Sequence, residues 1–120
     1  MTEGVRFVRA YPERVVNDRD WQAVDELVLP EYVGKGDGWP EDRDALRSFY
    51  RWQAETRPGW RIDVQETVEL GDCVVVRALA GGTATEEGVA RREDVEWLAA
   101  YRLAGGRIAQ IELLALQDRS

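Results

Sequence analysis

Apolar residues recur at helical spacing in the first half of this 120-residue chain, which predicts three helices there. Valines over residues 5–16 predict the first helix, and Pro12 should kink or break it because proline lacks a backbone N–H. A second apolar face over residues 21–28 follows two aspartates that can cap a helix. Residues 42–57 predict the third helix, after a glycine-rich segment, residues 31–40, that is typical of a loop.

The second half of the chain alternates between apolar and polar residues and predicts four strands. Gly105 and Gly106 separate the last two apolar runs, which is a strong signal for a β-hairpin with a two-residue turn. Residues 81–92 are polar and glycine-rich, and we expect them to connect two strands without regular structure. The predicted strands cover residues 60–70, 73–80, 93–103 and 108–117.

Helices that precede an antiparallel sheet indicate an α+β fold, and the length suits one domain over residues 1–120. The composition, 44% hydrophobic with five tryptophans, is typical of a folded globular chain. No apolar stretch approaches the roughly 20 residues that a membrane helix requires, and the first residues lack the features of a secretory signal. We therefore expect a cytoplasmic protein with no membrane partner.

Charge and residue types exclude several classes of function. The net charge of −7 argues against nucleic acid and anionic membrane surfaces as partners. The chain has no histidine, which excludes Ser-His-Asp and Cys-His catalysis and histidine metal sites. Cys73 is the single cysteine, so an internal disulfide and a cysteine zinc site are excluded as well. We expect no metal and no cofactor, and chemistry must rest on carboxylates, tyrosines, arginines or Lys35.

Several short segments in a fixed order carry a family resemblance over nearly the whole chain. They are Asp20-Trp21, Val24-Asp25-Glu26-Leu27, Glu31-Tyr32-Val33, Asp44-Ala45-Leu46-Arg47-Ser48-Phe49-Tyr50, Pro58-Gly59-Trp60-Arg61-Ile62, Gly71-Asp72-Cys73-Val74-Val75-Val76-Arg77, Gly82-Thr83, Tyr101-Arg102 and Gly106-Arg107-Ile108. Together they resemble the SnoaL-like polyketide cyclase family of the nuclear transport factor 2-like superfamily. The resemblance implies a cone-shaped fold, with three N-terminal helices packed on a curved antiparallel sheet around a hydrophobic pocket.

The same resemblance implies that the outer face of the sheet is a dimer surface. We therefore expect a homodimer, with Val75, Arg77 and Leu79 as candidate contacts.

The sequence departs from the family pattern where catalysis would be expected. Lys35 stands near the place of one family histidine, and Ala84 stands where a second histidine follows Gly-Thr. In the last strand the family has a tryptophan and, four residues later, an aspartate used as general acid or base. Glu112 and Leu116 occupy those two places here, so the family's usual catalytic pair is absent in register.

Glu112 is the best candidate for chemistry because it lies within the last apolar run. In a regular strand the residues that share its face are Ile108, Gln110, Leu114 and Leu116. If this face lines the pocket, burial raises the pKa of the carboxyl and suits it to proton transfer next to a carbonyl.

Two tyrosines are the predicted catalytic partners of Glu112. Tyr101 and Tyr11 could each donate a hydrogen bond to a ligand oxygen, although tyrosine is more often a residue of the core edge. For Glu112 itself, the alternative is a structural ion pair with Arg77 or Arg102 on a neighbouring strand.

Six further residues are predicted to contact a ligand. The polar ones fall in or near the glycine-rich segment, which in this fold tends to lie at the pocket mouth, and the tryptophans could wall a pocket for a flat ligand. The alternatives are solvated loop charges and ordinary core tryptophans. The six are Tyr32, Lys35, Asp37, Trp39, Trp52 and Trp97.

Residues 91–94 superficially resemble the Asp-Arg-Asp arrangement of limonene-epoxide-hydrolase-like members of the same fold, with a solvated charge run as the alternative. Three functional hypotheses remain. The first is a cofactor-free cyclase, isomerase or dehydratase that moves protons with carboxylates on a cyclic or polyketide-like substrate. The second is a non-catalytic binder of a small hydrophobic ligand, and the third is a structural dimer module with a filled pocket.

Overall fold

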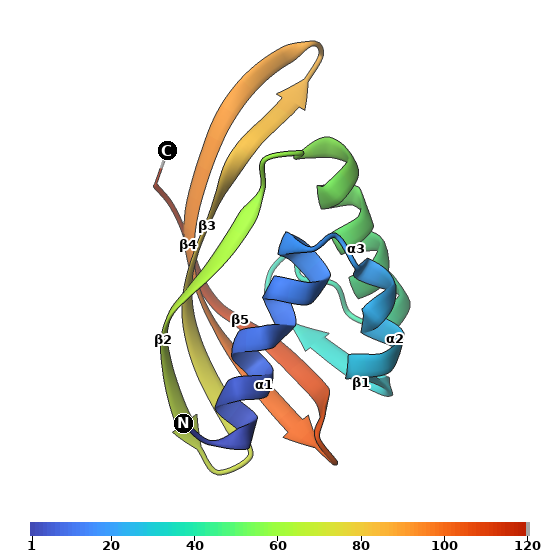
Figure 1. Cartoon of the computed structure of the whole chain (residues 1–120), viewed down its shortest axis with the longest axis vertical. Coiled ribbons are helices and arrows are strands. Elements are labelled where there is room, and N and C mark those ends of the chain that lie inside the picture. The colour runs from blue at the N-terminus through green and yellow to red at the C-terminus, as the bar shows by residue number, and fades with distance from the viewer. Residues whose placement is uncertain (120) are drawn as a thin grey trace.

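All helices lie on one side of a curved five-stranded sheet in the computed structural model of the chain (Figure 1). The structure describes residues 1–119, and the side chains of all of these except residues 84–86 and 91. The helical elements are α1 (Glu3–Pro12), η1 (Glu13–Asn17), η2 (Trp21–Ala23), α2 (Val24–Leu27) and α3 (Arg43–Thr56). The strands are β1 (Val28–Lys35), β2 (Arg61–Leu70), β3 (Cys73–Glu86), β4 (Val89–Ala104) and β5 (Arg107–Asp118).

The predicted interruption of the first helix occurs as a change of helix type at Pro12. Thr2 begins α1 by accepting a hydrogen bond from the backbone N–H of Val5 at 3.2 Å. After Pro12, which cannot donate a backbone hydrogen bond, the chain continues as the π-helical turn η1. The turn ends at Asn17, whose side chain donates to the Ile62 carbonyl (3.0 Å) and accepts from the Ile62 N–H (2.9 Å), which ties it to β2.

The loop predicted over residues 31–40 is wrong for its first half, because residues 28–35 form β1. This strand pairs in parallel with β5, which supplies the backbone partners that local sequence does not reveal. Pro30 is tolerated because β1 lies at the sheet edge. The sheet order is β1-β5-β4-β3-β2, so the sheet is mixed, and the prediction of a purely antiparallel sheet is wrong at this edge.

The irregular connection predicted over residues 81–92 is also wrong. β3 and β4 pair without interruption from Cys73↔Arg102 to Glu86↔Val89, and this hairpin projects beyond the helices (Figure 1). Its turn holds Glu87 and Gly88, with φ of 50° and 79°. The hairpin predicted at Gly105 and Gly106 is confirmed, and both residues have positive φ (58° and 77°), as a type I′ turn requires.

The core lies between the helices and the inner face of the sheet. In β3 the alternate residues Val74, Val76, Ala78 and Ala80 are buried there, and in β4 the alternate residues Trp97, Ala99 and Tyr101 are buried. β5 does not alternate in this way, because it carries two bulges. Ala109 and Leu114 are extra residues without partners in β4, and each reverses the face of the residues that follow.

None of the helices in residues 1–119 combines the length and the hydropathy that crossing a membrane would require.

Candidate functional site

One pocket opens between α3 and the inner face of the sheet and is walled by indole rings. We call it the tryptophan pocket, after Trp39, Trp52, Trp60 and Trp97, and its volume is about 200 Å³. α3 contributes Trp52, β4 contributes Trp97, and Trp39 and Trp60 come from the segments on either side of α3. The remaining lining residues are Asp37, Gly38, Phe49, Gln53, Arg57, Glu93, Val95, Leu113 and Leu116.

Aromatic side chains contact one another along the pocket wall in a continuous row. The ring centroids of Trp97 and Trp39 lie 6.4 Å apart at an interplanar angle of 71°. Trp39 is followed by Phe49 at 5.5 Å, and Phe49 by Trp52 at 6.2 Å. Edge and tilted contacts of this kind fix the rings relative to one another, so the wall is a continuous aromatic surface.

Tyr32 positions Trp39 from outside the pocket. Its hydroxyl accepts a hydrogen bond from Nε1 of Trp39 at 2.9 Å and donates to the carbonyl of Pro40 at 3.3 Å. Burial raises the pKa of the Tyr32 phenol, and the hydrogen bond from Trp39 acts in the opposite direction. Tyr32 does not line the pocket, so the structure places it behind Trp39 and not at the ligand contact that was predicted for it.

Arg57 follows α3 directly and lies between two walls of the pocket. Its guanidinium carbon is 4.4 Å from the ring centroid of Trp52 and 5.6 Å from that of Trp60. Its Nε forms an ion pair with Oε2 of Glu93 at 3.3 Å, and the side chain is only 14% exposed. The pair balances the charge of Arg57 and fixes the carboxylate of Glu93 at the pocket.

Two polar groups lie among the apolar walls without a protein partner. Gln53 is 6% exposed and is the only buried polar residue among the side chains that the structure describes. Its amide forms no hydrogen bond with the described residues. Trp60 is 4% exposed, and within the described part of the chain its Nε1 has no acceptor.

Tyr11, Tyr50 and Tyr101 lie deeper in the core, below the tryptophan pocket. Tyr11 donates a hydrogen bond to the hydroxyl of Tyr50 at 3.0 Å, and its ring contacts Tyr101 edge-on at a centroid distance of 6.1 Å. The narrow space beside Tyr101, between Trp97 and Ile111, has no room for a water molecule. Tyr101 and Tyr11 are thus packed below the tryptophan pocket and line none of its surface.

Glu112 lies on the outer face of the sheet, so the condition under which it would line the pocket is not met. Ile111 pairs with the buried Tyr101, whereas Glu112 pairs with Ala100 on the opposite face. The bulge at Ala109 causes the difference, because it turns Ile111 and Leu113 inward instead of Gln110 and Glu112; the bulge at Leu114 then places Leu116 opposite Trp97.

On that face Glu112 neither lines the tryptophan pocket nor forms the ion pairs that were considered for it. Its parallel partner is the exposed Lys35, and neither residue lines the tryptophan pocket. The ion pairs considered for Glu112 do not form either. Arg77 pairs with Glu66 at 2.7 Å, and Arg102 pairs with Asp72 at 2.9 Å.

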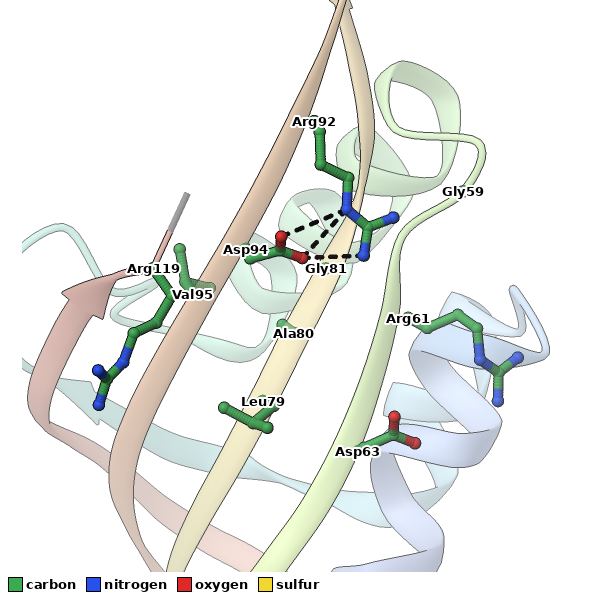
Figure 2. A pocket seen from close by; sticks show the side chains of 10 residues that line it. All are labelled: Gly59, Arg61, Asp63, Leu79, Ala80, Gly81, Arg92, Asp94, Val95 and Arg119. Carbon is green, nitrogen blue, oxygen red and sulfur yellow. Dashed lines mark hydrogen bonds and ion pairs between the residues drawn. The ribbon is translucent and has the colours of Figure 1, made fainter.

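A second, larger hollow of about 580 Å³ lies on the outer face of the sheet (Figure 2). Arg92 forms an ion pair with Asp94 there at 2.9 Å, while the side chains of Arg61 and Arg119 point away from each other (Figure 2). Glu93, the next residue to Arg92, belongs to the tryptophan pocket instead. Residues 92–94 therefore divide between two faces of the sheet and form no acid–arginine–acid cluster, and the side chain of Arg91 lies outside the described residues.

The structure brings together four of the nine predicted site residues: Asp37, Trp39, Trp52 and Trp97. Sequence analysis missed Arg57, Trp60 and Gln53 as site residues, and it considered Glu93 only within the charged run of residues 91–94. The helical spacing of Gln53 from the apolar residues Leu46, Phe49 and Tyr50 was the available signal for a buried polar group. Among the described residues no group of three or more acidic or cysteine side chains is arranged to hold a metal ion.

Comparisons with known proteins agree with this fold. The sequence profile of the SnoaL-like domain matches residues 8–111. No curated protein sequence matches the chain. Wild-type IdmH from Streptomyces antibioticus, a suggested polyketide cyclase, is 24% identical with a TM-score of 0.80, over 98% of this chain and 93% of IdmH. A loop-truncation variant of IdmH is 26% identical with a TM-score of 0.75, over 92% of this chain and 91% of the variant.

The same fold occurs in a Mycobacterium tuberculosis LEH-like epoxide hydrolase. That structure has a TM-score of 0.74 and 16% identity, over 92% of this chain and 80% of the hydrolase. At this level of identity the similarity concerns the fold alone.

Proposed function

The chain belongs to the SnoaL-like domain family, and from that premise we propose that it binds a small cyclic organic molecule in the tryptophan pocket. The observation that carries the proposal is the meeting of four indole rings around one open cavity of about 200 Å³. Concave, mainly apolar surfaces with few polar groups are typical of small-molecule sites. An apolar cavity of about 150 Å³ accepts benzene, so this pocket suits a ligand of one or two rings.

Ligand titration tests this proposal. Compounds of one or two rings are titrated against the protein and followed by changes in their NMR signals. Trp52→Ala is the informative variant, because Trp52 lines the pocket yet is 50% exposed, so the fold should tolerate its loss. We expect saturable binding that weakens about tenfold in this variant, since a wall ring contributes at least about 1.4 kcal/mol.

Leu98→Ala is the matched control. Leu98 is also a partly exposed apolar residue but lies outside the pocket, so its affinity should equal that of the unmodified protein. Failure of every compound to bind would contradict the proposal and favour a structural dimer module.

Proton transfer on the bound molecule is a second candidate function. It is favoured by the two carboxylates that line the pocket, Asp37 at the rim and Glu93 in its pair with Arg57. A carboxylate can remove and return a proton at a carbon next to a carbonyl, the step that cyclases and isomerases of this kind require. The suggested polyketide cyclase activity of IdmH supports the same class of reaction.

Hydrogen–deuterium exchange distinguishes this activity from binding alone. Cyclic ketones are incubated with the protein in D₂O, and loss of the α-hydrogen signal is measured. Glu93→Gln or Asp37→Asn should reduce the exchange rate at least about 100-fold while binding persists. Glu112→Gln should leave the rate unchanged, because Glu112 lies on the outer face. The opposite pattern would return the catalytic role to Glu112.

A further inference from the structure

We infer that Arg19 is a positioning residue for the tryptophan pocket, because its side chain holds the turn that carries Arg57 and Trp60. Arg19 itself does not line the pocket. The inference rests on the proposed binding function and adds a residue outside the pocket that determines how tightly a bound molecule is held.

The turn over residues 57–60 carries two walls of the pocket, one at each end. The backbone N–H of Trp60 donates to the carbonyl of Arg57 at 3.0 Å and closes the turn. Both residues line the pocket, and the guanidinium carbon of Arg57 lies 5.6 Å from the ring centroid of Trp60. A shift of this turn therefore moves both walls together.

The guanidinium of Arg19 contacts this turn through backbone carbonyls. Its Nη2 donates to the carbonyl of Pro58 at 2.8 Å and to that of Arg57 at 3.4 Å. Its Nη1 donates to the carbonyl of Val16 in η1 at 2.9 Å. One planar side chain thus joins the end of η1 to a turn that follows it by almost 40 residues.

The backbone at Arg19 indicates that its side chain has a specific use. Its φ is 61°, and it is the second residue after η1, a place where a positive φ normally selects glycine. Within the described part of the chain, Glu87 is the only other residue besides glycine with a positive φ. A glycine would meet the backbone requirement without strain, whereas it could not reach the two carbonyls of the turn.

Asn17 holds the neighbouring start of β2 independently of Arg19. Its side chain forms two hydrogen bonds with the backbone of Ile62, at 2.9 and 3.0 Å. Because Asn17 remains in any variant of Arg19, β2 should keep its place. We therefore expect the loss of the Arg19 side chain to affect the turn and the pocket walls rather than the fold.

The Nε–H signal of Arg57 tests this placement without a ligand. In the folded protein Nε donates to Glu93 at 3.3 Å, and the side chain of Arg57 is only 14% exposed, so exchange of this proton with water should be slow. The signal is assigned in ¹⁵N-labelled protein with Arg57→Lys. In Arg19→Gly, which removes the guanidinium and relieves the strained φ, exchange should accelerate at least about tenfold.

Binding of 1-tetralone, a compound of two rings, gives the second measurement. We expect its affinity to fall about five- to tenfold in Arg19→Gly, because Arg57 and Trp60 are then no longer held in place before binding. Arg19→Lys retains a donor on a long side chain and should restore part of both effects. The melting temperature of Arg19→Gly should stay close to that of the unmodified protein, because relief of the positive φ offsets the lost hydrogen bonds.

Glu87→Gly is the matched control, because it relieves the other positive φ at an exposed residue outside the pocket. It should change neither the Arg57 signal nor the affinity. Unchanged affinity in Arg19→Gly, whatever the Arg57 signal does, overturns the inference and leaves the proposed function intact. If no compound of one or two rings binds the unmodified protein, the proposed function fails, and the Arg57 signal alone decides whether Arg19 places the turn.

Discussion

At the scale of single residues, burial of all four tyrosines decides what they can do. Burial raises the pKa of each phenol above its ordinary value of 10. In the folded protein the phenols therefore stay protonated well beyond pH 10. They can donate hydrogen bonds and pack against one another, but they do not act as bases near neutral pH.

Alkaline unfolding tests the protonation of these tyrosines. Below pH 10 the phenols are protonated in both the folded and unfolded states, so stability does not depend on them there. Above pH 10 the unfolded chain releases protons that the folded chain retains, and stability falls by about 1.4 kcal/mol per pH unit for each tyrosine. We expect tyrosinate absorbance at 295 nm to stay flat past pH 10 and then to rise together with loss of the circular dichroism signal.

Tyr11→Phe is the control for this prediction. It removes one of the four titrating phenols and the hydrogen bond to Tyr50. The dependence of stability on pH above 10 should fall by about a quarter. Gradual ionisation near pH 10 in a fully folded protein would show that the tyrosines are accessible to solvent.

At the scale of elements, β1 matters because it holds one wall of the pocket in place. The backbone N–H of Gly34 donates to the carbonyl of Glu41 at 2.8 Å, so the segment between them closes against the strand. A Cβ atom at Gly34 would meet the carbonyl oxygen of Pro40 and lie 2.7 Å from the hydroxyl of Tyr32. Tyr32 in turn holds Trp39, so the absence of a side chain at Gly34 helps to place a pocket wall.

Gly34→Ala should therefore impair both stability and binding. The new Cβ must displace backbone rather than a flexible side-chain end, and overpacking of this kind costs about 1–3 kcal/mol. The melting temperature should fall by roughly 5–10 °C, and ligand affinity should fall as Trp39 moves. Calorimetry and the titration described above measure the two effects.

Gly59→Ala provides the comparison for Gly34→Ala. Its added Cβ would lie 3.5 Å from the nearest atom, the backbone nitrogen of Thr83, which is an ordinary contact. The free energy of unfolding of the Gly59→Ala variant should change by no more than about 0.5 kcal/mol. Equal effects of the two substitutions would contradict the steric argument.

The same elements show what the sequence could and could not predict. Helical spacing and the Gly105-Gly106 turn depend on neighbouring residues, and both were predicted correctly. β1 depends on pairing with β5, which follows it by more than 70 residues, so its local sequence resembled a loop. The two bulges of β5 leave no local signal either, and strict alternation therefore placed Glu112 on the wrong face. The indole walls were predictable because large aromatic rings favour burial. The Arg57–Glu93 pair was not predictable, because it joins segments that are distant in the sequence.

At the scale of the whole molecule, the helices cover one face of the sheet and leave the other uncovered in a single chain (Figure 1). That outer face combines exposed apolar residues with paired charges. Leu79 and Leu98 are 38% and 36% exposed, and Arg77 lies among them with Glu66 and Glu96 as partners. A surface with apolar residues and both signs of charge can face a second copy of itself across a two-fold axis.

A homodimer through this outer face remains our prediction for the assembly. Sedimentation or light scattering at micromolar concentration should give twice the 13.7 kDa of one chain. Leu79→Lys should shift the protein to the monomer, because a lysine in the middle of the interface would be buried without a partner.

Val89→Lys is the control for this substitution. Val89 is also apolar and is 64% exposed, but it lies at the tip of the β3–β4 hairpin, away from the centre of the face, so its replacement should leave the dimer intact. Because the tryptophan pocket opens on the other side of the sheet, the Leu79→Lys monomer should still bind the ligand. A monomeric unmodified protein would contradict the prediction, and loss of ligand binding in the monomer would show that the pocket depends on the second copy.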